Sequence, residues 1–265
     1  MKKLLQLLFI AVTITACKNE TKEAPTVVET VETEDITTSI YPENISNVFD
    51  AHGSIDNWNK MQTLSFSMVK PTGKEIVTEN LKTRAELIDT PAYTQGFDGE
   101  TLWIQEKDGK EYKGKPKFYK GLMFYFYAMP YVLGDDGISY QDIEPLEFEG
   151  KSYPGILISY EEGVGESSED QYKIYYDAKT GKMEWLGYTV TFGKGEGSDD
   201  FHFIRYNNWQ TVNGLVVPKS IDWYKYKNNV PTEKRNTVEF TDVLLSKKAP
   251  DTNIFVKPEG AKIIE

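Results

Sequence analysis

The sequence has few of the residues that enzymes most often use for nucleophilic catalysis or for binding transition metals. It contains one cysteine, Cys17, and two histidines, His52 and His202. A single cysteine excludes an intrachain disulfide and a zinc–thiolate cluster. The sequence also lacks an HExxH pair, a GxSxG nucleophile motif and a phosphate-binding loop. We therefore expect no metal, no other cofactor and no enzymatic activity.

The apolar segment near the start of the chain is too short to cross a bilayer, which takes roughly 20 apolar residues. It runs from Leu4 to Ile14 behind two lysines, which is typical of a secretory signal peptide. The residues Ile14-Thr15-Ala16-Cys17 resemble a bacterial lipobox. The resemblance implies cleavage before Cys17 and acylation of this residue, and two or three acyl chains hold a protein stably on a membrane. The alternative is a buried structural cysteine after a plain signal peptide or a short anchor.

The chain has fewer basic than acidic residues. It contains 30 Lys and Arg and 41 Asp and Glu, which gives a net charge of −11 at pH 7. Such a chain repels nucleic acid and anionic lipid head groups. We therefore expect no nucleic-acid partner, and attachment to the membrane only through the lipid on Cys17. We place the protein, as a monomer, in the cell envelope at the outer membrane, and leave open whether it faces the periplasm or the surface.

The segment after the cysteine is rich in Glu and Thr and has no aromatic residue before Tyr41. It cannot bury enough apolar surface to offset the entropy of ordering it. We therefore expect a signal peptide at residues 1–16, a lipidated and flexible acidic tether at 17–41, and a single domain at 42–265.

The domain begins with a helical pattern. One face of the predicted helix carries Ile45, Val48, Phe49 and His52. The helix is expected to end at Gly53, and Ser54 can cap a second short helical turn. His52 is interpreted as a packed histidine bonded to the backbone, and His202 as a structural residue of a strand.

From Gln62 onward apolar residues recur at every second position, which is the spacing of a β-strand. Leu64, Phe66 and Met68 alternate with polar residues, which predicts a strand with one buried and one solvent-exposed face. We expect one long or bent strand over "KEIVTENLKTRAELID" and a hairpin turn at Asp98-Gly99. Further strand and turn signals follow, so the predicted fold is mainly β with minor α: a large curved antiparallel sheet or half-open barrel, with one or two helices on its concave face.

One segment, "KFYKGLMFYFYAMPYVLGDDG", interrupts the strands with a helical pattern. It places Phe118, Leu122, Met123 and Phe126 on one face, where we expect a movable lid over an apolar groove. Trp103 and Trp185 are expected to contribute to the groove walls.

Aromatic residues make up 13% of the chain, and many alternate along strands. Tyr172, Ile174 and Tyr176 share one face, and Leu186, Tyr188, Val190 and Phe192 share another. These side chains either fill a core or line a cavity for a ligand that is mostly hydrocarbon with a polar end.

Several short motifs resemble the lipoprotein-carrier (LolA/LolB-like) superfamily. They are "GFDGETLWI", "YYDAKTGKMEWL" and "WQTVNGLVVPKSIDWY". Two others, "DAHGSIDNW" and "NIFVKPEGAKII", resemble an uncharacterised family of Bacteroidetes lipoproteins. The resemblance spans residues 44–265 and implies a half-open antiparallel barrel whose groove carries lipids or acyl chains.

Two hypotheses for the function remain. The first is a lipid-anchored carrier or receptor that holds an acyl chain or another apolar molecule without chemistry. The second is a surface lipoprotein that binds glycans or proteins through exposed aromatic residues. A weaker third option, hydrolysis, requires two carboxylates that converge in one cleft. The acidic pairs Asp135-Asp136 and Asp199-Asp200 are interpreted as loop residues, because they lack the spacing of a calcium loop.

Overall fold

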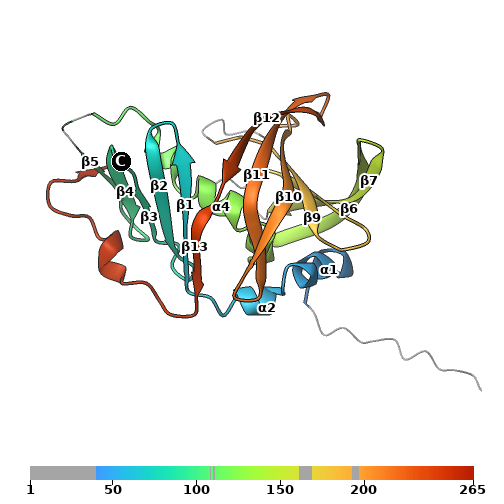
Figure 1. Ribbon diagram of the computed structural model, residues 1–265, viewed down its shortest axis with the longest axis horizontal. Coiled ribbons are helices and arrows are strands. Elements are labelled where there is room, and N and C mark those ends of the chain that lie inside the picture. Colours follow the sequence, from blue (N-terminus) through green and yellow to red (C-terminus); the bar gives the residue numbers. More distant parts are fainter. Residues whose placement is uncertain (1–39, 108, 110, 161–168, 193–196) are drawn as a thin grey trace, which may run out of the picture. The chain divides into compact units, whose positions relative to one another are not determined.

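The computed structural model describes residues 40–107, 109, 111–160, 169–192 and 197–265. The predicted signal peptide, Cys17 and the tether up to residue 39 lie outside the described residues. The described residues form one compact unit and are the part of the chain shown in colour in Figure 1.

Within the described residues, fourteen strands form two antiparallel sheets of seven strands each. The first sheet has the order β13-β1-β2-β3-β4-β5-β14 and the second the order β12-β11-β10-β9-β8-β7-β6. The first comprises β1 (Thr63–Lys70), β2 (Gly73–Asn80), β3 (Glu86–Asp89), β4 (Tyr93–Phe97), β5 (Leu102–Glu106), β13 (Thr241–Ser246) and β14 (Lys262–Ile263). The second comprises β6 (Ile138–Phe148), β7 (Lys151–Tyr160), β8 (Tyr172–Tyr176), β9 (Met183–Tyr188), β10 (His202–Val212), β11 (Leu215–Lys227) and β12 (Val230–Glu239).

At one junction of the two sheets a single residue, Phe240, separates β12 from β13 in the chain. Its buried ring contacts Phe66 at 5.3 Å and Tyr127 at 4.8 Å between ring centroids. Figure 1 shows β12 and β13 beside β11 and β1 at this junction. The prediction of a mainly β, antiparallel and open architecture is confirmed, with the strands distributed over two sheets.

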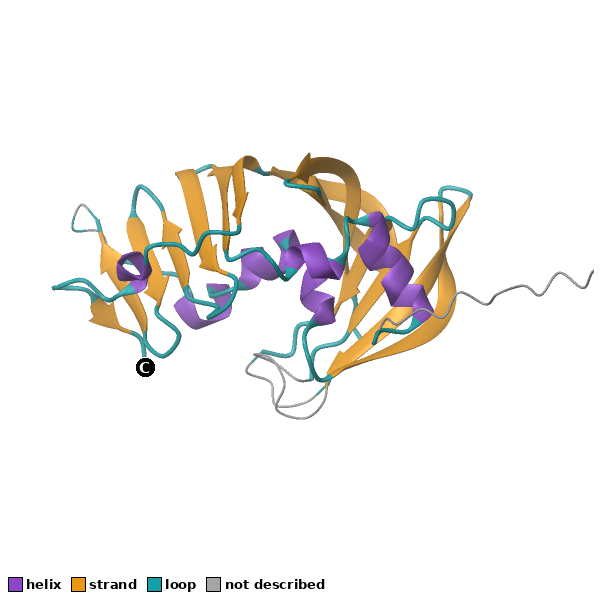
Figure 2. Ribbon diagram, turned by 90° about the horizontal axis from the view of Figure 1, so that it is seen from below, coloured by secondary structure: helices purple, strands orange, loops and turns teal. Residues whose placement is uncertain are grey.

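Few helices accompany the sheets. They are α1 (Glu43–Ala51), α2 (Ile55–Trp58), α3 (Pro116–Tyr119), α4 (Leu122–Tyr127) and the 3-10 turns η1 (Tyr131–Gly134) and η2 (Thr252–Phe255). In Figure 2 most of them lie along the inner side of the curved strands. The ring of Tyr127 in α4 stacks on Phe66 of β1 at 4.4 Å, and Phe126 contacts Trp223 of β11 at 5.9 Å. Because α4 contacts both sheets, it lies at the centre of the main core.

The first helix follows its predicted pattern, since Ile45, Val48 and Phe49 are buried. The side chain of Ser54 caps α2 by accepting a hydrogen bond from the N–H of Asn57. His52 is fully buried (0% exposed) and is bonded to the backbone of β11 and β9. The interpretation of His52 as a packed, backbone-bonded histidine is therefore confirmed.

The expectation of one long strand over "KEIVTENLKTRAELID" was wrong, because the segment forms the hairpin β2–β3. The turn is set by Asn80, whose side-chain oxygen accepts hydrogen bonds from the N–H groups of Lys82 and Thr83 at 3.0 and 3.2 Å. Arg84 then adopts a positive φ of 59°. A side chain that bonds to the backbone two and three residues further on favours a turn over an extended chain.

The helical segment over residues 116–127 is present but interrupted. Lys120 is extended and Gly121 has a φ of 71°, which is the left-handed conformation that glycine adopts without penalty. The result is two short helices, α3 and α4, joined at Gly121.

Candidate functional site

A cavity of about 350 Å3 lies between the α3–α4 segment and the second sheet. Phe118, Leu122, Met123 and Phe126, the four residues predicted to face a groove from this segment, all line it. Whether they contact a ligand stays a prediction. The segment also contributes Tyr125, which was not predicted.

The opposite wall comes from strands of the second sheet. Tyr172, Tyr188, Val190 and Phe192, whose alternation indicated either core or cavity, line the cavity. Tyr160 and Trp223 line it too and were not predicted. The same period of two could have identified both, because Tyr160 follows the buried Ile156 and Ile158 on one face of β7, and Trp223 follows Ile221 on β11.

Trp103 does not line the cavity, contrary to the expectation from the sequence. It lies on the outer face of the first sheet, where its indole N–H donates a hydrogen bond to the carbonyl oxygen of Phe255 at 2.8 Å. Its ring lies against Gly96 of the neighbouring strand, where an added Cβ would be 2.1 Å from Trp103 Cζ2. The tryptophan therefore holds the C-terminal segment against this face.

Trp185 does not line the cavity either. It belongs to a second apolar cluster with Tyr153, Phe203 and others, on the face of the second sheet opposite to the main core. Its ring packs against Phe148 at 4.7 Å and Tyr224 at 4.8 Å. Because side chains alternate along a strand, its neighbour Leu186 faces the main core instead.

Aromatic rings dominate the cavity walls. Phe126 makes an edge-to-face contact with Tyr188 at 5.0 Å, and Phe118 makes one with Phe192 at 5.7 Å. Tyr160 and Tyr172, on neighbouring strands, contact each other at 5.8 Å. These contacts fix the ring orientations on both sides of the cavity, since edge-to-face pairs add to the stabilisation from burial.

The tyrosine hydroxyls of the wall are protonated at ordinary pH. Burial raises the pKa of Tyr160, and the neighbouring Tyr172 and Tyr125 add to the effect. Burial also raises the pKa of Tyr172, and the nearby Asp170 adds to it. In Tyr188 burial again raises the pKa, while a hydrogen bond with Trp223 opposes the shift. The hydroxyls are therefore hydrogen-bond donors and acceptors without charge.

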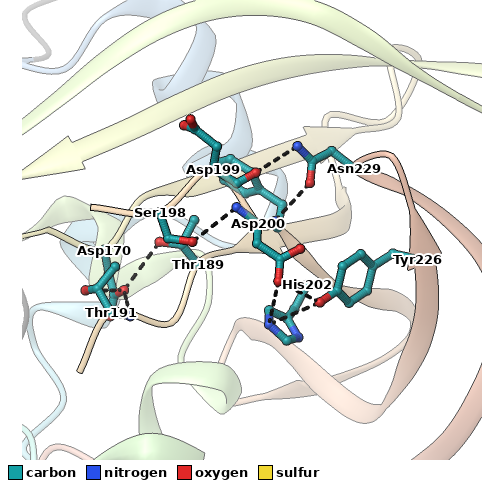
Figure 3. Close-up of polar contacts among 10 residues, drawn as sticks. Asp170, Thr189, Thr191, Ser198, Asp199, Asp200, His202, Tyr226 and Asn229 are labelled. Carbon is teal, nitrogen blue, oxygen red and sulfur yellow. Dashed lines mark hydrogen bonds and ion pairs between the residues drawn. The ribbon is translucent and has the colours of Figure 1, made fainter. Parts of the chain in front are cut away.

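Two carboxylates line the cavity, and protein groups already bind both. Asp170 accepts hydrogen bonds from the backbone N–H of Thr191 at 2.7 Å, from its hydroxyl at 2.8 Å and from the hydroxyl of Thr189 at 3.3 Å, as Figure 3 shows. Asp135 forms an ion pair with Arg84, whose Nη2 lies 2.7 and 3.0 Å from its two oxygens. The two acids therefore have structural partners.

The α3–α4 segment is bound to the first sheet by buried carboxylates. Glu86 accepts a hydrogen bond from the N–H of Gly121, at 3.0 and 3.2 Å to its two oxygens. Glu75 accepts one from the hydroxyl of Tyr119 at 2.6 Å and pairs with Lys70 at 2.7 Å. Hydrogen bonds to a charged acceptor are stronger than those between neutral groups. One side of the segment is thus held by polar bonds, while its other side faces the cavity.

His202 belongs to a polar cluster behind the cavity wall. The hydroxyl of Tyr226 lies 3.0 Å from an Asp200 oxygen and 3.4 Å from His202 Nε2 (Figure 3). The imidazole stacks on the ring of Tyr188 at 5.4 Å. This arrangement fits the structural role expected for His202.

No cluster of three or more His, Cys, Asp or Glu residues that could hold a metal ion occurs within the described ranges. Among the helices of the same residues, none combines the length and the apolar character that crossing a bilayer requires.

Several solved structures are similar to this chain. A LolA superfamily protein from Nitrosomonas europaea shares 11% identity, with 74% of this chain and 88% of that chain covered and a TM-score of 0.43. An outer membrane lipoprotein-sorting protein domain from Vibrio parahaemolyticus shares 8% identity over 77% and 96% of the two chains, with a TM-score of 0.40. A DUF1329 family protein from Desulfovibrio piger shares 10% over 77% and 94%, with a TM-score of 0.44. The superfamily to which the sequence motifs pointed is thus among these structures.

No curated protein matches the chain. The profile of a family of unknown function, DUF6503, matches residues 101–239. This match spans more than half of the 265 residues and includes most of the cavity wall. The chain therefore belongs to the DUF6503 family.

Proposed function

We propose that this protein is a lipid-anchored lipoprotein of the cell envelope whose β domain binds a hydrophobic ligand without transforming it. The cavity between α3–α4 and the second sheet carries the proposal. Its volume of about 350 Å3 falls within the range of roughly 300–1,000 Å3 that is usual for small-molecule sites. Its walls are mostly apolar and aromatic with a few hydroxyls, as expected for a ligand that is largely hydrocarbon.

The anchor in this proposal rests on the lipobox resemblance at Cys17. Acylation at this residue would hold the chain at a membrane, where apolar molecules are concentrated. We propose the outer membrane as its location, and a monomer as its state. Intact-mass analysis of the native protein tests the anchor. We expect a chain that begins at Cys17 and carries the added mass of its acyl chains, whereas an unmodified Cys17 behind an intact leader contradicts it.

A non-catalytic role is supported by the protein groups that already bind the two carboxylates of the cavity. Hydrolysis by a carboxylate pair needs one acid to donate a proton and the other to act as base or nucleophile. Asp135 is paired with Arg84, and Asp170 accepts hydrogen bonds from Thr189 and Thr191. The carboxylates therefore stabilise the cavity wall in this proposal.

The surface-binding alternative finds little support in the distribution of aromatic residues. Across the described ranges Phe192 is the one aromatic side chain that is exposed, at 41%, and it lies at the cavity itself. An aromatic surface for stacking on glycans would need several exposed rings in a row.

Binding of a neutral fluorescent probe, N-phenyl-naphthylamine, tests the proposed function. The full chain carrying Cys17→Ser is used, because the substitution removes the acylation site and leaves the described residues unchanged. We expect probe fluorescence to rise on binding, and Leu122→Trp to abolish the rise by filling the cavity. Leu244→Trp is the matched control, since Leu244 is exposed on β13 outside the cavity. Equal responses from both variants, or none from the unsubstituted cavity, contradict the proposal.

A further inference from the structure

We infer that the ligand of this cavity is an uncharged, ring-bearing molecule with a hydrogen-bond acceptor, and not an unbranched acyl chain with an anionic head group. The inference deepens the proposed function and rests on it. It depends on three features of the cavity: the aromatic rings in its walls, the tyrosine hydroxyls without a protein partner, and the acidic residues of its lining.

The walls present flat π faces and ring edges from two sides. Phe126 on α4 lies 5.0 Å from Tyr188 and 5.9 Å from Trp223 on the second sheet, and Phe118 lies 5.7 Å from Phe192. Aromatic pairs in offset or edge-to-face geometry gain affinity beyond the area that they bury. A planar ring packed against these aromatic side chains from within the cavity makes such contacts, whereas an alkyl chain gains only from burial.

Two tyrosine hydroxyls in the wall are available to a ligand. Two tyrosines outside this wall use their hydroxyls within the protein: Tyr206 donates to the carbonyl oxygen of Phe126 at 2.8 Å, and Tyr119 donates to Glu75. The buried hydroxyl of Tyr127 lacks a partner, but Tyr127 does not line the cavity. In the described part of the chain, the hydroxyls of Tyr160 and Tyr172 have no such partner. Their rings lie on the neighbouring strands β7 and β8.

These hydroxyls are held as donors. Burial raises the pKa values of Tyr160 and Tyr172, so both keep their protons over the physiological range. Neither hydroxyl is among the buried polar atoms that lack a partner, so both are accessible to a molecule in the cavity. A carbonyl or hydroxyl oxygen on the ligand would satisfy both hydroxyls and would orient the ring system in the cavity.

The charges at the cavity disfavour an anionic head group. Asp135 and Asp170 lie in the lining, and Asp170 is close enough to Tyr172 to contribute to its pKa shift. A carboxylate or phosphate placed at the tyrosine hydroxyls would be repelled by these acids, because like charges interact strongly where water is excluded. Two lysines also line the cavity: Lys117 is exposed, and Nζ of Lys120 lies 4.1 Å from the centre of the Phe97 ring.

Calorimetric titration of the full chain carrying Cys17→Ser tests the inference with matched ligands. Acetylnaphthalene has a ring system and a carbonyl acceptor, and ethylnaphthalene has the same shape without the acceptor. Decanol and decanoate are unbranched, neutral and anionic respectively. We expect acetylnaphthalene to bind most tightly and decanoate most weakly of the four.

The hydroxyls are tested by Tyr160→Phe and Tyr172→Phe, which keep the rings. Each substitution is expected to weaken acetylnaphthalene binding by about two- to tenfold, the usual range for one hydrogen bond. Ethylnaphthalene binding is expected to stay unchanged. Tyr176→Phe is the control, because Tyr176 lies on the same strand and face as Tyr172 but does not line the cavity.

The outcomes separate this inference from the proposed function. If decanol or decanoate binds as tightly as acetylnaphthalene, or if the two variants leave acetylnaphthalene binding unchanged, the inference is overturned while hydrophobic binding stands. If none of the four ligands binds, the proposed function itself is overturned.

Discussion

Acidification is expected to destabilise the domain through His52. The imidazole is fully buried, with Nδ1 3.0 Å from the carbonyl oxygen of Val216 and Nε2 3.1 Å from the N–H of Met183. The backbone N–H of Met183 needs an acceptor, so Nε2 is unprotonated and Nδ1 donates to Val216. A second proton, on Nε2, would place two donors against each other in a fully buried site. The folded state therefore requires a neutral His52.

The size of the effect follows from the pKa. Burial lowers the pKa of His52 from 6.5 to about 4, with a smaller contribution from Lys182, while the hydrogen bond to Val216 opposes the shift. Because the unfolded chain binds the proton more tightly, the contribution of His52 to stability is complete above pH 6.5 and is lost as the pH falls toward 4. At 1.36 kcal/mol per pKa unit, the loss is about 3 kcal/mol at pH 4.

Urea unfolding followed by tryptophan fluorescence, between pH 7.5 and pH 4, measures this loss. The informative quantity is the difference in unfolding free energy between the wild-type protein and His52→Gln, because glutamine does not titrate and the acids common to both proteins cancel. We expect this difference to shrink by about 3 kcal/mol over the range. His202 is present in both proteins, so any contribution that it makes cancels in the difference. A difference between wild type and His52→Gln that does not vary with pH refutes the reasoning.

Three further predictions concern the first sheet and the segment bound to it. Burial and the nearby Glu86 raise the pKa of Glu79 well above its usual value, so the folded state favours its protonated form and Glu79→Gln should raise the urea midpoint at pH 8 but not at pH 4. Gly121→Ala should destabilise the domain by about 1–2 kcal/mol, the penalty for a left-handed residue with a Cβ, as thermal or urea unfolding will show. Gly96→Ala should cost about 1–3 kcal/mol or more in the same assay, because its Cβ would displace the Trp103 ring, and a red-shifted tryptophan emission should accompany the loss.

Local patterns predicted the elements that depend on near neighbours in the chain. The alternation of Leu64, Phe66 and Met68 places all three in the main core, and Asp98-Gly99 joins β4 to β5. The division into two sheets depends instead on pairs such as Leu64 with Leu245. Nothing in the sequence near either residue specifies this pairing, so periodicity alone indicated one continuous sheet.

The two tryptophans show why cavity residues were harder to assign than strands. The alternation of apolar and polar residues along a strand indicates which side chains share a face of the sheet. It does not indicate which face the α3–α4 segment covers. Both faces of the second sheet bury apolar clusters, one around Leu186 and one around Trp185. Hydrophobicity therefore could not separate the two faces. Tyr188 and Tyr172, which share a face with residues of the main core, were the better guides to the cavity.

The inner face of the first sheet departs from the usual pattern in a way that bears on the cavity. Val77 and the flanking Glu75 and Glu79 point inward together, so carboxylates occupy positions where apolar side chains are expected. Such groups are stable in the interior only when they are bonded or protonated. The hydroxyl of Tyr119 satisfies Glu75, and the N–H of Gly121 satisfies Glu86. The polar face thus adds direction-specific bonds to the apolar packing by which Phe126 and Tyr127 already hold the α3–α4 segment. Because both kinds of contact act on the segment, we expect this wall of the cavity to keep its position when a ligand binds.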